Sequence, residues 1–234
     1  MISPKSVISV QRLHKNLWWY SVANILLTMV TLYTKDMVWL IAGSVLGLLY
    51  WISRYFIDHP NISFPQSPAN ALTLLRICLL VMTTMMSPGI TLFEAGVLYS
   101  IICLGDILDG YVARKLNMTT LIGEYLDKET DALFVLMSTT VLYLTGHAGI
   151  WVIGLGLIRY IYFTGMYFFI TPDQKEIKDP WAKYIAIFLF VSILSCFLLP
   201  GTFSKSLLIT AAGLILYSFT RVALIELRII KVAE

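Results

Sequence analysis

Acidic residues at helical spacing are the part of this sequence with the clearest capacity for chemistry. Six of the fourteen acidic residues lie between Asp106 and Asp131, where one apolar run ends and the next begins. Asp106 and Asp109 are three residues apart, and Asp127 and Asp131 are four apart. Residues at these spacings share one helical face. We therefore expect the first pair to point together from the end of one helix and the second pair to face it from the start of the next.

Four carboxylates brought together would repel one another strongly without a cation between them. Their hard oxygen ligands suit Mg²⁺, Mn²⁺ or Ca²⁺. The small residues Gly110, Ala113 and Gly123 leave room for a ligand to approach the backbone beside the carboxylates. The ordinary alternative, a solvated loop, is disfavoured because ionisable groups next to apolar runs are costly. The pattern predicts a site for a metal-bound phosphate compound.

Apolar helices must position these residues. The chain is 58% hydrophobic and only 13% charged, whereas soluble globular domains carry about 25% charged residues. A transmembrane helix needs roughly 20 predominantly apolar residues. Eight candidate runs lie at about 17–34, 36–57, 68–87, 90–110, 126–146, 148–170, 180–199 and 206–229. The sequence predicts an all-α integral membrane protein with about eight transmembrane helices.

A polar, proline-containing segment at 58–67 divides these runs into two and six. It predicts a cytoplasmic lead-in and two-helix N-terminal extension at 1–65, followed by a six-helix core at 66–234. Lysine and arginine concentrate on one side of the predicted topology. By the positive-inside tendency, both termini and the carboxylates are expected on the cytoplasmic side. The three cysteines lie inside apolar stretches and are expected to pack without disulfides.

The acidic segment resembles the signature of the CDP-alcohol phosphotransferase family. The stretch Asp106-Ile-Leu-Asp109-Gly110-Tyr-Val-Ala113-Arg114 is followed, after eight residues, by Gly123-x-x-x-Asp127-x-x-x-Asp131. Every signature position is present with its spacing. A second, weaker similarity is the Asn-x-x-Thr-x-x-Arg pattern of Asn70, Thr73 and Arg76. The resemblance covers roughly residues 66–231 and leaves out the first two helices.

The resemblance implies a six-helix core, usually dimeric, whose active site opens to the cytoplasmic leaflet. By this similarity, Asp106, Asp109 and Asp127 bind Mg²⁺ or Mn²⁺, and Asp131 also helps to ligate the metal. The catalytic residues would be Asp131, as general base on the acceptor hydroxyl, and Asp127. Gly110, Ala113 and Gly123 would line the cytidine pocket. Arg114 would either contact the donor or support the loop through an ion pair.

The upstream pattern leaves two interpretations open. Asn70, Thr73 and Arg76 share one helical face, and Arg76 would face inward near the donor diphosphate. Alternatively, Asn70 and Thr73 cap the start of the helix while Arg76 extends to the interface.

Basic residues in the later apolar runs are candidates for binding an acceptor that carries phosphate: Arg159, Lys183, Arg221 and Arg228. Arg159 is the most informative, because a lone arginine inside an apolar helix more often faces a polar cavity than lipid. The other three could instead be cytoplasmic anchors. Phosphatidylglycerophosphate synthases are one candidate subgroup. They often have an acidic residue after this arginine and Ser-Gly before the lysine, whereas this chain has Tyr160 and Trp181-Ala182.

The function expected from these features is phospholipid synthesis. A phosphatidyl group would pass from CDP-diacylglycerol to the hydroxyl of a small polar alcohol, such as glycerol 3-phosphate, with release of CMP. The alternatives are a CDP-choline or CDP-ethanolamine phosphotransferase acting on diacylglycerol, and a non-catalytic membrane scaffold. The expected partners are membrane lipids and a second copy of the chain, with no nucleic acid. The expected location is a bacterial or archaeal cytoplasmic membrane.

Overall fold

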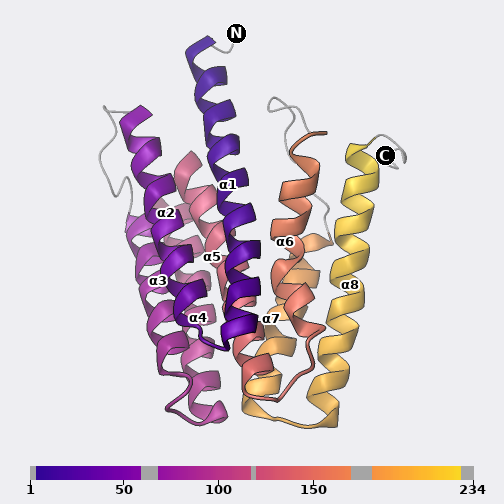
Figure 1. Ribbon diagram of the computed structural model, residues 1–234. Coiled ribbons are helices and arrows are strands. Elements are labelled where there is room, and N and C mark those ends of the chain that lie inside the picture. Colours follow the sequence, from indigo (N-terminus) through magenta and orange to yellow (C-terminus); the bar gives the residue numbers. More distant parts are fainter. Residues whose placement is uncertain (1–3, 59–67, 117–119, 170–180, 228–234) are drawn as a thin grey trace.

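The computed structural model describes residues 4–58, 68–116, 120–169 and 181–227 (Figure 1). Within these ranges the chain forms eight helices and no strand. They are α1 (Pro4–Thr34), α2 (Val38–Asp58), α3 (Pro68–Met86), α4 (Leu92–Leu116), α5 (Leu121–Leu144), α6 (Val152–Met166), α7 (Ala182–Leu198) and α8 (Thr202–Glu226). The predicted all-α class is confirmed.

The helices form one bundle in which successive helices run in opposite directions, so that α1 begins and α8 ends at the same end (Figure 1). Each helix packs on its neighbour in the pairs α1–α2, α3–α4, α5–α6 and α7–α8. Helix α5 also packs against α3 and α7, while α1 packs against α6 and α4 against α7. Consequently α5 is the central helix, and a polar group on it is enclosed by neighbours on several sides.

The helices around the acidic residues are longer than predicted. Helix α4 continues to Leu116 and α5 begins at Leu121, whereas the apolar runs ended at 110 and began at 126. Thr120 is the N-cap of α5, and its side chain accepts a hydrogen bond of 3.0 Å from the Gly123 backbone N–H. With a rise of about 1.5 Å per residue, Asp127 lies about 9 Å and Asp131 about 15 Å along α5 from Leu121. The carboxylates therefore project from inside helices, not from their ends as predicted.

Helix length and composition qualify the prediction of eight transmembrane helices. Among the described residues, two helices are long and apolar enough to cross a membrane, Val38–Asp58 and Thr202–Glu226. Three more apolar helices are shorter, at Asn70–Met86, Val152–Met166 and Ala182–Leu198. The count of eight helices is thus confirmed for the described part, but only two of them satisfy the criterion for a span. Charged residues inside α4 and α5, including the candidate site itself, lower the hydropathy of those helices.

The distribution of side chains fits a bundle surrounded by lipid. Many large apolar residues are exposed, including Tyr33, Phe168 and Phe203. Many hydroxyl groups are instead buried, and Ser138, Thr139 and Thr140 in the middle of α5 donate back to carbonyls of their own helix. Small and hydroxyl-bearing residues are typical of helix interfaces in membranes, where lipid already solvates large apolar groups.

The two N-terminal helices pack on the rest of the bundle through specific polar contacts. Trp18 of α1 donates its indole N–H to the backbone carbonyl of Thr164 in α6 at 3.2 Å. His14 lies 3.1 Å from the hydroxyl of Tyr125, one turn into α5. Residues 4–16, which precede the first predicted apolar run and belong to the predicted lead-in, are part of α1. This helix contacts both α5 and α6. The division of the chain at residue 65 stays a prediction.

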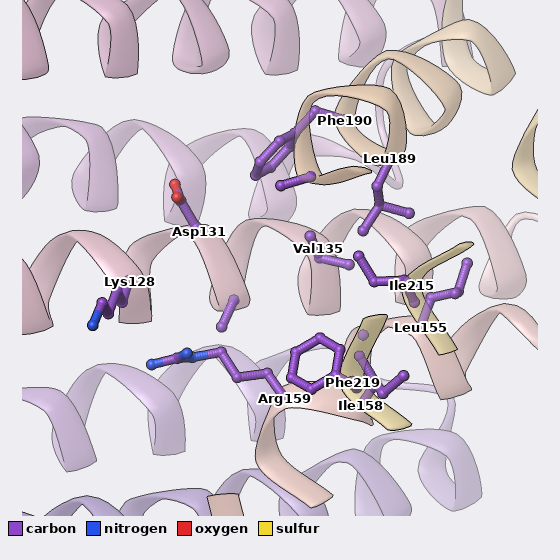
Figure 2. A pocket seen from close by; sticks show the side chains of 13 residues that line it. Lys128, Asp131, Val135, Leu155, Ile158, Arg159, Leu189, Phe190, Ile215 and Phe219 are labelled. Carbon is purple, nitrogen blue, oxygen red and sulfur yellow. The ribbon is translucent and has the colours of Figure 1, made fainter. Parts of the chain in front are cut away.

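A cavity of about 190 Å³ lies among α5, α6, α7 and α8 (Figure 2). Its lining is apolar on most sides and includes Val135, Leu155, Ile158, Leu189, Phe190, Ile215 and Phe219. At one end the lining is charged and consists of Lys128, Asp131 and Arg159. The bundle thus provides an amphipathic space beside one of the predicted site carboxylates.

Candidate active site

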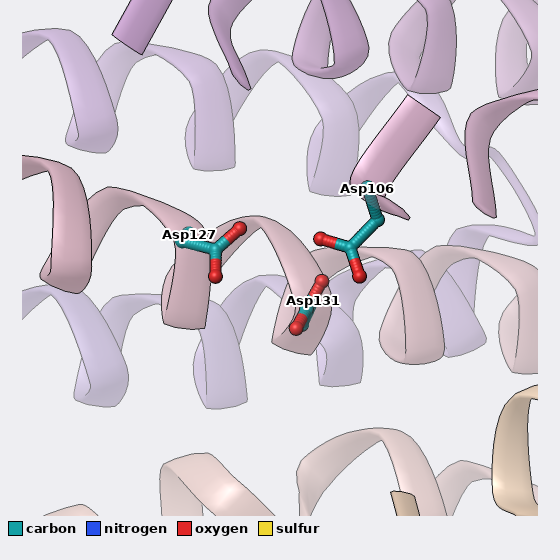
Figure 3. Close-up of side chains that lie close together, drawn as sticks. All are labelled: Asp106, Asp127 and Asp131. Carbon is teal, nitrogen blue, oxygen red and sulfur yellow. The ribbon is translucent and has the colours of Figure 1, made fainter. Parts of the chain in front are cut away.

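Three of the four predicted carboxylates come together. Asp106 projects from α4, and Asp127 and Asp131 project from successive turns of α5 (Figure 3). One carboxylate oxygen from each lies within 4.8 Å of those of the other two. The three side chains are between 35% and 46% exposed, so that a ligand can reach them. The i, i+4 spacing placed the two α5 carboxylates on one face, as predicted.

Arg76 of α3 lies among the three carboxylates. Its guanidinium Nη1 is 2.5 Å from Asp106 Oδ1 and 3.2 Å from Asp127 Oδ1, and its Nη2 is 2.8 Å from Asp131 Oδ1. The side chain is buried, because α3 packs against both α4 and α5. Gly105 makes room for the arginine stem, since a Cβ at that position would be 3.3 Å from Arg76 Cγ. Arg76 faces inward, as one of the two interpretations of the sequence expected.

The donor set fits a hard divalent cation. Three oxygen ligands from two helices converge within one ion's reach, and carboxylates are the ligands that Mg²⁺ and Mn²⁺ prefer. The position of the Arg76 guanidinium, bonded to all three carboxylates, indicates how strongly this point of the structure favours positive charge. A dication bound here would share or take over the compensation that Arg76 provides.

The first turns of α3 and α5 are tied together near the carboxylates. Asn70, which is buried, donates its side-chain N–H to Thr120 Oγ1 at 3.2 Å. The same hydroxyl accepts from the backbone of Gly123. A Cβ on Gly123 would lie 2.4 Å from Asn70 Oδ1 and 2.8 Å from Thr120 Oγ1, so that only glycine allows this approach. Thr73, one turn after Asn70, is also buried on α3.

Several predicted residues lie outside the part that the structure describes in full. The backbone of α4 continues through Asp109 to Leu116, which places Asp109 about one turn beyond Asp106. The side chains of Asp109 and Arg114, and the surroundings of Gly110 and Ala113, are outside the described part. Arg228 follows the last described residue. Their predicted roles remain predictions.

Of the predicted acceptor cations that the structure describes, Arg159 is the one that lines the cavity. It lies on α6, and its guanidinium is grouped with Lys128 and Asp131 at the charged end (Figure 2). Its Nη2 is 2.7 Å from Glu129 Oε1 of α5. Lys183 is exposed in the first turn of α7, and Arg221 is half-buried on α8; neither lines this cavity.

Two residues at the site have no counterpart in the sequence prediction. Lys128 lines the cavity, pairs with Glu124 at 3.3 Å and lies 5.7 Å from the centre of the Tyr125 ring. Glu129 is buried and pairs with Arg159. A sequence signal for this pair existed, because an arginine in an apolar helix needs a buried partner. Glu129 is one of the two acidic residues of the cluster, with Glu124, to which the sequence pattern assigned no role.

Comparison with known proteins agrees with the similarity seen in the sequence. The family model described as CDP-alcohol phosphatidyltransferase matches residues 67–222, more than half of the chain. No match was found among curated proteins or among solved structures. The matched range contains the three described carboxylates, Arg76 and the charged end of the cavity. It begins at the start of α3 and leaves out α1 and α2.

Proposed function

Because the chain belongs to the CDP-alcohol phosphatidyltransferase family, a family of membrane enzymes of phospholipid synthesis, we propose that it uses CDP-diacylglycerol. It transfers the phosphatidyl group to the hydroxyl of a small polar alcohol and releases CMP. One observation carries this proposal. Asp131 belongs both to the carboxylate group and to the lining of the amphipathic cavity, and this shared residue supports a metal site next to an acceptor site.

The carboxylates have the roles of metal ligand and base in this proposal. Asp106, Asp109, Asp127 and Asp131 would hold Mg²⁺ or Mn²⁺, which when bound supplies charge compensation at the donor diphosphate and at the departing CMP. Asp131 faces the cavity and takes the proton from the attacking hydroxyl. The P–O bond to CMP breaks as the bond to the acceptor oxygen forms, so that no protein nucleophile is needed.

The start of α3 and the signature glycines form the donor side of the site. Asn70 and Thr73 line the cytidine pocket together with Gly110, Ala113, Arg114 and Gly123. The contact of Asn70 with Thr120 and Gly123 supports this arrangement, because it holds the first turns of α3 and α5 together beside the carboxylates. Arg76 contacts the donor diphosphate when a cation compensates the carboxylates.

The charged end of the cavity favours an acceptor that carries phosphate, such as glycerol 3-phosphate. Arg159 and Lys128 both line that end, next to the proposed base. Arg159 binds the phosphate, and Lys183, Arg221 and Arg228 extend the cationic surface. The apolar remainder of the lining favours a second candidate, diacylglycerol as acceptor with CDP-choline or CDP-ethanolamine as donor. Both classes therefore belong in the first test.

The proposed setting is a bacterial or archaeal cytoplasmic membrane, with the protein as a homodimer. The end of the bundle at which α1 begins and α8 ends faces the cytoplasm, as the distribution of lysine and arginine favours. Helices α1 and α2 stabilise the six-helix core, to which α1 is attached by Trp18 and His14.

Release of CMP by the purified protein in lipid-containing micelles tests the proposal. CDP-diacylglycerol is offered with glycerol 3-phosphate, inositol phosphate, serine or inositol, and CDP-choline or CDP-ethanolamine with diacylglycerol, each with Mg²⁺ or Mn²⁺. Metal-dependent CMP from CDP-diacylglycerol with a phosphorylated acceptor is the expected result. Release only from the CDP-choline or CDP-ethanolamine reactions would overturn the donor assignment. Release by the Asp131→Asn variant at the wild-type rate would overturn the assignment of the base.

A further inference from the structure

Glu129 is the one acidic residue between Asp127 and Asp131, yet it belongs to a different group of side chains. Two residues along a helix correspond to a rotation of about 200°, so Glu129 points away from the face of α5 that carries the metal ligands. There its carboxylate is buried and only 5% exposed, and it contacts Arg159 of α6. The reaction needs no carboxylate on that side of α5.

We propose that Glu129 is a positioning residue for the acceptor: it fixes the Arg159 guanidinium at the charged end of the cavity, beside Asp131. The ion pair joins Glu129 Oε1 to Arg159 Nη2 at 2.7 Å, while Arg159 keeps about a quarter of its side chain exposed. The arginine is therefore fixed by Glu129 on the α5 side and still accessible from the cavity. This inference rests on the proposed function, in that Arg159 meets an anionic acceptor.

An arginine placed in this way binds an oxyanion better than a free one. Its long side chain has several rotatable bonds, and a guanidinium already held in place loses less conformational freedom when an anion binds. Asp131 and Arg159 line the same end of the cavity. The side chain that orients the acceptor phosphate and the side chain that takes the proton from the acceptor hydroxyl therefore have fixed positions relative to each other. Because Asp131 and Glu129 are two residues apart on one rigid helix, α5 fixes both.

Buried aromatic residues of α1 and α6 enclose Glu129. The rings of Tyr20 in α1 and Tyr160 in α6 are 6.3 Å apart, both residues are buried, and Glu129 is an electrostatic neighbour of each. Enclosure on this side leaves the carboxylate without competition from bulk water, which strengthens its hold on the guanidinium. Helix α1, outside the matched family range, thus helps to enclose the positioning residue.

Binding of an anion and turnover, measured on the same full-length variants in micelles, test the proposal. The probe is glycerol 3-phosphate, followed by calorimetry in the absence of donor and by the acceptor and donor KM values for CMP release. Glu129→Gln should weaken glycerol 3-phosphate binding and raise the acceptor KM about tenfold, with the donor KM unchanged. Glu129→Asp should restore part of the loss, which a volume effect alone would not produce.

Two further variants separate positioning from a structural role. Glu94→Gln is the matched control. It removes one negative charge from the first turn of α4, which begins at the end of the bundle opposite to the start of α1 (Figure 1). Glutamine can also accept the hydrogen bonds from Thr91, so both KM values should stay unchanged. In an Arg159→Gln background, Glu129→Gln should have no additional effect on anion binding, because the residue it positions is gone. This double variant removes both charges of the Glu129–Arg159 pair, so neither of the two is left buried without the other.

The possible results distinguish the positioning role of Glu129 from the proposed function. Wild-type binding in Glu129→Gln, tighter binding in Glu129→Gln, or the absence of Arg159-dependent anion binding in the wild type would overturn the positioning role. Weakened binding in Glu129→Gln, together with no CMP release from any phosphorylated acceptor, would support the positioning role and overturn the proposed function. CMP release with an acceptor KM unaffected by Glu129→Gln would keep the function and overturn the inference.

Discussion

Arg76 offers the sharpest test of how the carboxylate group is stabilised. Its guanidinium makes three contacts of 2.5, 2.8 and 3.2 Å with carboxylates on two helices. Replacing Arg76 by glutamine keeps much of the side-chain volume but removes the positive charge. In the absence of a divalent cation, three carboxylates would then repel one another inside the bundle. We expect Arg76→Gln to lower the thermal stability of the metal-free protein.

The size of this stability loss follows from the number of contacts that Arg76 makes and from the exposure of the carboxylates. A hydrogen bond to a charged group contributes about 1.5–3 kcal/mol when buried. The carboxylates are 35–46% exposed, and solvent screening reduces each contact to about 1 kcal/mol. Three contacts then contribute about 3 kcal/mol in total. In a chain of this length, about 1 kcal/mol corresponds to a Tm change of about 2–4 °C, so the expected decrease is about 10 °C.

The assay is thermal unfolding of the purified protein in micelles, with EDTA or with saturating Mn²⁺. In EDTA the variant should unfold about 10 °C below the wild type. With Mn²⁺ the difference should shrink, because a cation bound by the carboxylates compensates the charge that glutamine lacks and stabilises the folded state by mass action. Arg54→Gln on α2 is the control for loss of one positive charge. An unchanged Tm of Arg76→Gln in EDTA, or a difference that Mn²⁺ leaves intact, would refute the reasoning.

Two further predictions concern the packing of α6 and the base. Gly156→Ala should lower the free energy of unfolding by about 1–3 kcal/mol, because the new Cβ would lie 2.7 Å from the backbone Cα of Leu136. The control is Gly154→Ala on the same helix, whose Cβ would meet nothing within 4 Å and which should be neutral or stabilising. Equal Tm values for the two variants would contradict this. Asp131→Asn should abolish CMP release while the protein keeps its fold, and EDTA should do the same to the wild type; normal turnover in either case would show that Asp131 or the metal is dispensable.

The helices and the carboxylate pattern were predictable because each depends on local spacing. Apolar runs gave all eight helices of the described part, and the i, i+4 spacing gave the shared face of Asp127 and Asp131. The helix ends were not predictable in the same way. Apolarity marks where a helix meets lipid, while the backbone hydrogen bonds of α4 and α5 continue through charged residues to Leu116 and from Leu121. The N-cap at Thr120 was the missed signal.

Contacts between helices distant in sequence were beyond the reach of spacing alone. That Arg76 bonds to three carboxylates depends on α3 packing between α4 and α5, which the order of helices along the chain does not determine. The same holds for the cavity, whose walls come from four helices. The sequence indicated that Arg159 is an unusual residue for an apolar helix, but only the packing of α6 on α5 identified Glu129 as its partner.

The two faces of α5 explain why one short acidic segment can serve two purposes. Asp127 and Asp131 are separated by about 400° of helical rotation and so return to the same side, where they meet Asp106 and Arg76. Glu129, halfway between them, faces α6 and Arg159. Were Glu129 on the metal-binding face, its charge would add to the repulsion there and Arg159 would lose its anchor. Because both faces belong to one helix, a displacement of α5 would alter the metal ligands and the anion-binding arginine together. Variants that disturb the packing against α5, such as Gly156→Ala on α6, should therefore lower turnover more than their loss of stability alone accounts for.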